Sequence, residues 1–125
     1  MSPLAVLFVA IGGACGATLR YLTAEATALM FGRAWTPAAT LLVNVAGCLL
    51  LGVVAARAGR GADAAWLIDN RPLVAAGFCG GLTTFSTFGF ETFELLETRP
   101  LAAIGLVAAH VIAGIAAVAV GMKLG

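Results

Sequence analysis

The sequence predicts an all-α membrane protein with four transmembrane helices in each subunit. Of the 125 residues, 62% are hydrophobic and only 10% are charged, whereas a soluble domain carries roughly 25% charged residues. The apolar residues form four segments, and each exceeds the roughly 20 residues that a helix needs to cross the hydrocarbon core. These observations predict a single four-helix transmembrane domain over residues 1–125.

The predicted spans cover about residues 4–30, 35–58, 72–96 and 100–124. Pro37, Pro72 and Pro100 lie near helix starts, where proline is tolerated. Trp35 and Trp66 lie where aromatic residues gather at the membrane surface. The connections are short, and an even number of spans places both ends of the chain on the same side.

No Lys or Arg precedes the apolar run of the first span, so we do not expect a cleavable signal peptide. Gly12 and Gly16 are spaced GxxxG, as are Gly77 and Gly81 in the third span, and this spacing lets helix backbones approach closely in lipid. Arg20 lies near the membrane edge. It is either an anchor whose charge reaches the interface or a positive charge that draws anions into a vestibule.

The second span holds one carboxamide at mid-depth. Asn44 is the only Asn, Gln or charged residue between Trp35 and Ala56, and its polar atoms need hydrogen-bond partners. Those partners are either groups on a neighbouring helix or a solute that passes along the helix. Thr40 lies one turn earlier on the same face, so the two residues form a polar stripe.

The third span contains the most informative motif, GGLTTFSTF over residues 80–88. We expect the paired glycines Gly80 and Gly81 to interrupt the helix, which would free carbonyl groups at Gly80 or Thr83 to hold a cation. Hydroxyl groups also gather here, at a depth where lipid gives no reason for them, and they favour a path for a small polar solute or ion. The hydroxyl side chains are those of Thr83, Thr84, Ser86 and Thr87.

Phe85 and Phe88 lie on one face of the same helix, and two interpretations of them remain open. Phenylalanine pairs in membrane helices usually contact lipid or pack against other helices. Among hydroxyl groups, however, the positively polarised edges of the rings would help to solvate an anion without a fixed charge. Glu91 follows one turn beyond Phe88, where it would line a vestibule.

His110 is the only polar side chain of the fourth span between Arg99 and Lys123. An isolated histidine in a membrane helix is often functional, or it packs in the neutral form with a bond to a backbone carbonyl. The three cysteines lie in apolar segments without CxxC spacing, so we interpret them as packing residues. The sequence has no Ser/His/Asp set, metal-ligand cluster, phosphate loop or basic patch, which argues against an enzyme and against nucleic-acid binding.

The basic residues are divided almost evenly between the two sides of the membrane, which gives a weak orientation bias by the positive-inside rule. Either a small preference sets the orientation, or copies insert both ways and pair antiparallel. We favour dual topology, because four short helices are too few to enclose a polar path alone. One side carries Arg57, Arg60, Arg71 and Lys123, and the other carries Arg33 and Arg99, with Arg20 as a third if its place near the helix end is counted.

Three motifs in order, one in each of the first three spans, show a specific resemblance to the CrcB/Fluc fluoride channels. They are GGACGATLRY over residues 12–21, TLLVNVAGCLLLG over residues 40–52 and GFCGGLTTFSTFGFE over residues 77–91. The resemblance implies antiparallel dual-topology homodimers with a broken third helix and two pathways for passive, selective fluoride export. It implies a bacterial plasma (inner) membrane location and resistance to fluoride toxicity.

The resemblance also implies roles for individual residues. Asn44 would face the ion path, and Phe85 and Phe88 would belong to an aromatic box that contacts fluoride. The carbonyls of Gly80 and Thr83 would hold a structural Na⁺ on the dimer two-fold axis. The remaining polar residues of the pathway would be Thr40, Ser86, Thr87 and, in a vestibule, Arg20.

The fourth span departs from the family pattern, because no Ser, Thr or Tyr follows Thr98. Either His110 or water supplies the missing hydrogen-bond donor, and a histidine on the path would make conduction depend on pH. The sequence argues against two rival functions. A small multidrug-resistance-type transporter needs a carboxylate deep in its first helix, where this chain has none. A structural membrane subunit leaves the buried Asn44 and the hydroxyl cluster unexplained.

Overall fold

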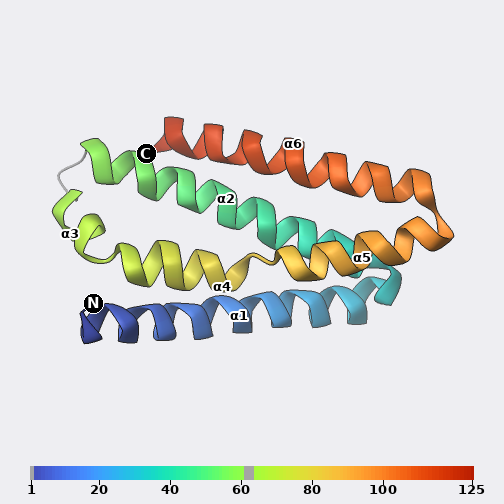
Figure 1. The fold of residues 1–125 in the computed structure, drawn as a ribbon, viewed down its shortest axis with the longest axis horizontal. Coiled ribbons are helices and arrows are strands. Elements are labelled where there is room, and N and C mark those ends of the chain that lie inside the picture. The colour runs from blue at the N-terminus through green and yellow to red at the C-terminus, as the bar shows by residue number, and fades with distance from the viewer. Residues whose placement is uncertain (1, 61–63) are drawn as a thin grey trace.

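The computed structural model describes residues 2–60 and 64–125, and it is all helical over the described residues (Figure 1). Four stretches are long and apolar enough to cross a membrane, namely Pro3–Phe31, Arg33–Arg60, Pro72–Thr98 and Pro100–Leu124. The prediction of four spanning helices is therefore confirmed. In chain order the elements are α1 (Pro3–Phe31), η1 (Arg33–Trp35), α2 (Thr36–Arg60), α3 (Ala64–Asp69), η2 (Pro72–Cys79), α4 (Gly80–Leu82), α5 (Phe85–Thr98) and α6 (Pro100–Leu124).

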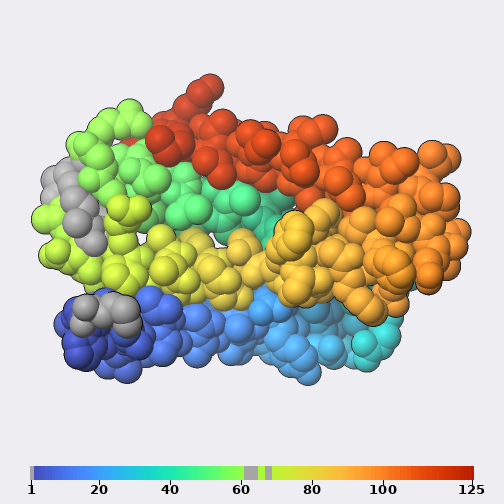
Figure 2. Space-filling model, viewed as in Figure 1, coloured from blue at the N-terminus to red at the C-terminus, as the bar shows by residue number. Residues whose placement is uncertain are grey.

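The spans pack as two main pairs that lie side by side. The most extensive contacts are those of α2 with α6 and of α1 with η2 and α4. Figure 1 shows the third span between α1 and the α2–α6 pair, with both chain ends at the end of the bundle that also holds α3. In Figure 2 a hollow separates η2, in yellow, from α2, in green.

The predicted glycine spacing brings α1 against the third span. A Cβ atom on Gly12 would collide with the carbonyl oxygen of Leu73, and one on Gly16 would collide with that of Phe78. A Cβ on Gly81 would lie 2.9 Å from the Cα of Gly13. These backbones meet with no room for a side chain, as expected where small residues let helices approach in lipid.

A second glycine contact, between α2 and α6, was not predicted. A Cβ on Gly52 would lie 3.1 Å from the Cα of Gly121, and a Cβ on Gly121 would collide with the carbonyl oxygen of Leu49. The chain has 16 glycines, so spacing alone does not identify the two that face each other across helices.

The connections fit the predicted short loops, with one addition. Gly32 ends α1 with a φ of +93°, a backbone conformation that side-chain-bearing residues rarely adopt, and the chain turns there into η1 and α2. The connection between the second and third spans contains the short helix α3, which the sequence analysis did not predict. The ends of α2 and α6 meet near this connection, where Arg60 donates a hydrogen bond of 3.2 Å to the Met122 carbonyl.

The third span changes its backbone twice. Its first part, η2, has π-helical turns. Two extended residues, Thr83 and Thr84, then separate α4 from α5. The expectation that Gly80 and Gly81 themselves interrupt the helix is wrong, because both are helical. Gly81 instead supplies the close contact with α1.

Candidate functional site

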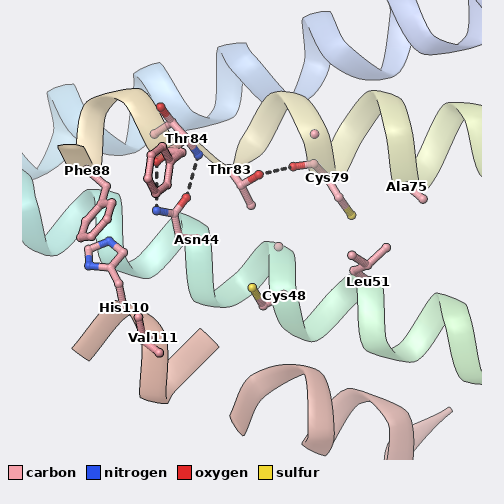
Figure 3. Close-up of a pocket in the computed structure, with 13 residues that line it drawn as sticks. Asn44, Cys48, Leu51, Ala75, Cys79, Thr83, Thr84, Phe88, His110 and Val111 are labelled. Atoms are coloured by element: carbon pink, nitrogen blue, oxygen red, sulfur yellow. Dashed lines mark hydrogen bonds between the residues drawn. The ribbon is translucent and has the colours of Figure 1, made fainter. Parts of the chain in front are cut away.

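A cavity of about 430 Å³ opens beside the interruption of the third span (Figure 3). Its walls come from α2, η2, α4, the Thr83–Thr84 segment, α5 and α6, and they are mainly apolar. The predicted site residues that line it are Asn44, Gly80, Thr83, Phe85, Phe88 and His110. The fold thus gathers residues from the second, third and fourth spans at one place.

Asn44 and Thr84 hold the interruption together. The Thr84 N–H donates to Asn44 Oδ1 over 2.7 Å, and Asn44 Nδ2 donates to the Thr84 carbonyl over 3.2 Å (Figure 3). The carboxamide therefore replaces the helical partners that an extended residue loses. One of the two hypotheses for Asn44, bonding to a neighbouring helix, is thereby observed. The second hydrogen of Nδ2 remains for another acceptor.

The hydroxyl groups of the motif form a small network at the start of α5. Thr84 is the N-cap residue, and its Oγ1 accepts a hydrogen bond of 3.2 Å from the Thr87 N–H. The same oxygen donates to Thr87 Oγ1 over 3.0 Å and lies 3.2 Å from Ser86 Oγ. Threonine is a favoured N-cap residue because its oxygen satisfies an otherwise unpaired N–H of the first turn.

The two phenylalanines of the motif are neighbours, but they differ in exposure. The ring centroids of Phe85 and Phe88 lie 5.6 Å apart with the planes tilted by 58°. Phe85 is 83% exposed in the single chain, whereas Phe88 is half-buried. The cavity is consequently open on the side where Phe85 lies.

His110 extends the aromatic group from the fourth span. Its ring centroid lies 4.3 Å from that of Phe88, and the planes are tilted by 40°. His110 Nδ1 lies 3.0 Å from the Leu106 carbonyl oxygen, and the buried Nε2 has no hydrogen-bond partner among the described residues. Figure 3 shows the two rings together at the end of the cavity near Asn44.

A second, smaller cavity of about 170 Å³ collects other residues of the predicted path. Arg20, Thr40 and Thr87 line it, and so does Thr84, which also lines the first cavity. The two cavities therefore share a wall at Thr84. Among the predicted pathway residues, Ser86 lines neither cavity and is exposed.

Arg20 takes a position that neither of its interpretations included. Its Nε donates a hydrogen bond of 3.2 Å to the Gly81 carbonyl oxygen. In a continuous helix that carbonyl would accept from the N–H of Phe85, four residues on. Arg20 thus pairs a backbone group next to the interruption, and it also lines the second cavity.

Glu91 is more buried than a vestibule residue should be. It is 8% exposed, and its Oε1 accepts a hydrogen bond of 2.8 Å from Thr40 Oγ1. Thr40 is also buried. The polar stripe of α2 therefore contacts the third span at two levels, since Thr40 bonds to Glu91 and Asn44 bonds to Thr84.

Thr84 is the central residue that the sequence analysis did not single out. It was counted among the hydroxyl groups, yet its backbone and side chain contact Asn44, Ser86 and Thr87. The sequence does contain a signal for this role. Thr84 lies three residues before Thr87, which is the spacing between an N-cap residue and the backbone N–H that donates to its side chain.

Two carbonyls of the interruption fit the donor set of a cation site. The N–H that would bond to the Gly80 carbonyl in a continuous helix belongs to Thr84 and donates to Asn44 instead. The N–H that would bond to the Thr83 carbonyl belongs to Thr87 and donates to Thr84 Oγ1. Carbonyls released from helical pairing are the ligands that unwound membrane helices offer to Na⁺.

Comparison with known proteins gives a consistent family match. A family profile described as "CrcB-like protein, Camphor Resistance (CrcB)" matches residues 7–122. A protein of Rhodococcus jostii named "Fluoride-specific ion channel FluC 2" is 45% identical over 120 residues, which cover 95% of this chain and 96% of that protein. A Frankia casuarinae protein named "Fluoride-specific ion channel FluC 1" is 45% identical over 122 residues, or 94% and 93% of the two chains. A Chloroflexus aurantiacus protein named "Fluoride-specific ion channel FluC" is 39% identical over 121 residues, or 96% and 94%.

Proposed function

This chain belongs to the CrcB family, and we propose that it is a fluoride-selective ion channel rather than an enzyme. As a multi-pass protein of the plasma membrane, it lets cytoplasmic fluoride leave passively down the membrane potential, which gives resistance to fluoride. The observation that carries the proposal is the group formed by Asn44, Thr84, Phe88 and His110. It places amide, hydroxyl and aromatic groups together among helices that are otherwise apolar.

The site suits a strongly hydrated anion, for which loss of water is the main barrier. The free hydrogen of Asn44 Nδ2, hydroxyl donors and the positive ring edges of Phe85 and Phe88 replace part of the lost hydration. Among the described residues, no Lys, Arg, Asp or Glu lines the larger cavity. Conduction requires binding weak enough for the ion to leave again, and a cavity without a permanent full charge meets this requirement.

The two cavities suggest the direction of the path within one subunit. Fluoride enters near Arg20, whose positive charge raises the local anion concentration. It then passes Thr84, which lines both cavities, and reaches Asn44 and the phenylalanines. Thr40 and Thr87 lie along the smaller cavity as polar lining, and Ser86 lies beside Thr84.

We further propose that two copies of the chain form an antiparallel, dual-topology homodimer. The support is the exposure of Phe85, which lines the larger cavity but leaves that side open in a single chain. A second copy covers the ring and completes the wall. Inverted pairing agrees with the weak charge bias, because neither orientation is strongly preferred.

In this assembly the interruption of the third helix would hold a structural Na⁺ at the two-fold axis. The carbonyls of Gly80 and Thr83 would bind it, because both lose their helical donors to Asn44 and Thr84. The ion would supply positive charge that joins carbonyl groups of two subunits.

The function is tested by fluoride efflux from liposomes that contain the purified protein, with valinomycin to clamp the potential and a matching chloride assay. Rapid fluoride release without chloride release is the expected result. Phe85→Ile should abolish the flux while the protein still elutes as a folded dimer. Phe90→Ile is the matched control, because Phe90 is exposed on the same helix but lines neither cavity.

Two results would contradict the proposal. Absence of fluoride release from well-folded wild-type protein would exclude the channel, and drug–proton antiport would be assayed next. Equal fluoride release by wild type and Phe85→Ile would exclude the assigned pathway.

A further inference from the structure

We propose that protonation of His110 regulates the passive passage of fluoride, so that the pathway conducts faster when this side chain is protonated. The inference rests on the proposed fluoride channel and concerns the regulation of the same site. It starts from the two ring nitrogens of His110, which have different surroundings. Nδ1 lies 3.0 Å from the Leu106 carbonyl oxygen, while Nε2 is buried without a partner among the described residues.

The Leu106 carbonyl determines which nitrogen carries the hydrogen. A carbonyl oxygen only accepts hydrogen bonds, so Nδ1 must be the N–H in this contact. In the neutral ring Nε2 is then an acceptor with a free lone pair. An acceptor cannot bind an anion, so neutral His110 offers nothing to fluoride at this nitrogen. A second proton, taken from water and later returned to it, converts Nε2 into a charge-assisted donor.

The neighbourhood favours an effect of this charge. Phe88 faces the ring from α5 at 4.3 Å between centroids, a position in which a cation is attracted to an aromatic face. The other titratable groups that line the cavity are the thiols of Cys48 on α2 and Cys79 on η2. Glu91 follows Phe88 by one turn, but its Oε1 accepts from Thr40. A protonated His110 would thus be the one full positive charge of this cavity within the described part of the chain.

Binding of fluoride and binding of the proton must then assist each other. Linkage requires that if the proton raises the affinity for fluoride by some factor, fluoride raises the affinity for the proton by the same factor. Typical coupling starts at about fivefold. That factor corresponds to an upward shift of about 0.7 pH units in the midpoint of the histidine titration when fluoride is saturating.

The single histidine of the chain allows a direct measurement. Protein with ¹⁵N-labelled histidine in lipid gives one pair of ring-nitrogen signals, free of overlap from other histidines. We expect the Nδ1–H tautomer near neutral pH and a titration midpoint that rises when fluoride, but not chloride, is added. An Nε2–H tautomer, or a midpoint that fluoride leaves unchanged, would overturn the proposal.

Efflux assays test the same coupling through conduction. At fluoride concentrations well below saturation, where flux follows affinity, wild-type flux should increase about fivefold between about pH 7.5 and about pH 5.5, after subtraction of the leak from protein-free liposomes at each pH. His110→Gln carries an uncharged amide donor at either pH and should show a flat profile. Val107→Ala, one turn away on α6 and outside the site, should keep the wild-type profile.

His110→Phe provides a second variant that preserves an aromatic ring against Phe88 and should also show a flat profile. If wild type conducts fluoride with a flat profile, or if His110→Gln keeps the increase in acid, the coupling is wrong and the channel stands. If wild type does not conduct fluoride at any pH, the proposed function itself fails.

Discussion

Asn44 and Thr84 exchange two hydrogen bonds, as paired strands do, although one residue uses its side chain and the other its backbone. The pair joins α2 to the extended segment of the third span. It satisfies both backbone groups of a residue that has left the helix. The same carboxamide keeps one hydrogen for the cavity, where we propose that it contacts fluoride.

Replacing Asn44 should lower both stability and conduction. Asn44→Leu leaves the N–H and carbonyl of Thr84 without partners, and each such loss costs about 1–3 kcal/mol. We expect a lower melting temperature and no fluoride flux. Asn44→Asp keeps an acceptor for the Thr84 N–H, but it loses the donor and places a negative charge beside the Thr84 carbonyl oxygen. It should therefore also melt at a lower temperature than wild type and fail to conduct.

The control for this experiment is Asn70→Ala. Asn70 also donates its side-chain hydrogen bond to a backbone carbonyl, that of Trp66, but at an exposed site outside the spans. It should melt like wild type. If Asn44→Leu and Asn70→Ala melt at the same temperature, the structural role of Asn44 is disproved.

The contact of α1 with the third span predicts a large effect of one methyl group. A Cβ on Gly16 would collide with the Phe78 carbonyl and lie 2.7 Å from the Leu82 amide nitrogen. Both are backbone atoms, so Gly16→Ala must separate the helices at a cost of about 1–3 kcal/mol. Gly105→Ala on α6 meets open space and should be neutral or stabilising by up to about 1 kcal/mol. Thermal unfolding in detergent compares the two, and similar destabilisation of both would refute the contact.

Arg20 combines a hydrogen bond with a charge, and two substitutions distinguish these properties. Arg20→Lys retains the positive charge, whereas Arg20→Gln retains only an uncharged donor for the Gly81 carbonyl. If the charge draws anions into the smaller cavity, the glutamine variant should lose flux at about 0.01 M salt and recover relative to wild type at about 1 M, where screening is short-ranged. A flux deficit independent of salt would assign Arg20 to the backbone contact alone.

Removal of sodium tests the proposed cation site. We expect a lower dimer melting temperature and slower fluoride efflux when Na⁺ is replaced by N-methylglucamine at constant K⁺, because the Gly80 and Thr83 carbonyls would lose the cation proposed to bind them. Choline, a second large cation, should give the same result as N-methylglucamine. Identical melting curves with and without Na⁺ would argue against a resident ion.

The sequence was sufficient for the spans because their signal is compositional. Runs of about 25 apolar residues leave few alternatives to a membrane helix, and the four helical stretches begin and end close to the expected residues. The interruption was placed at Gly80 and Gly81 because glycine weakens helices. The structure instead uses Thr83 and Thr84. Both backbone groups of Thr84 pair with Asn44, and the Thr84 hydroxyl accepts from the Thr87 N–H.

The sequence did not identify which residues pair with each other across spans. Asn44 was expected to need partners, but nothing in its own span identifies Thr84, which lies 40 residues away. For Arg20 the sequence predicts either an interfacial anchor or a vestibule charge. Its bond to the Gly81 carbonyl could not be predicted, because that carbonyl is available only once the third span is interrupted. The role of a residue that bonds to the backbone of the interruption cannot be predicted until the position of the interruption is known.

Asn44 pairs the Thr84 backbone and Arg20 pairs the Gly81 carbonyl within one chain, so these parts of the interruption form without a second copy. Assembly of the proposed dimer would then require little further folding of each copy. Two such copies would meet in the bilayer as preformed parts, and the rate of channel formation would depend on how often inverted copies collide. In a cell that makes the protein at a low level, the rate of channel formation would therefore be limited by encounters between copies in the membrane, even though each copy is already folded.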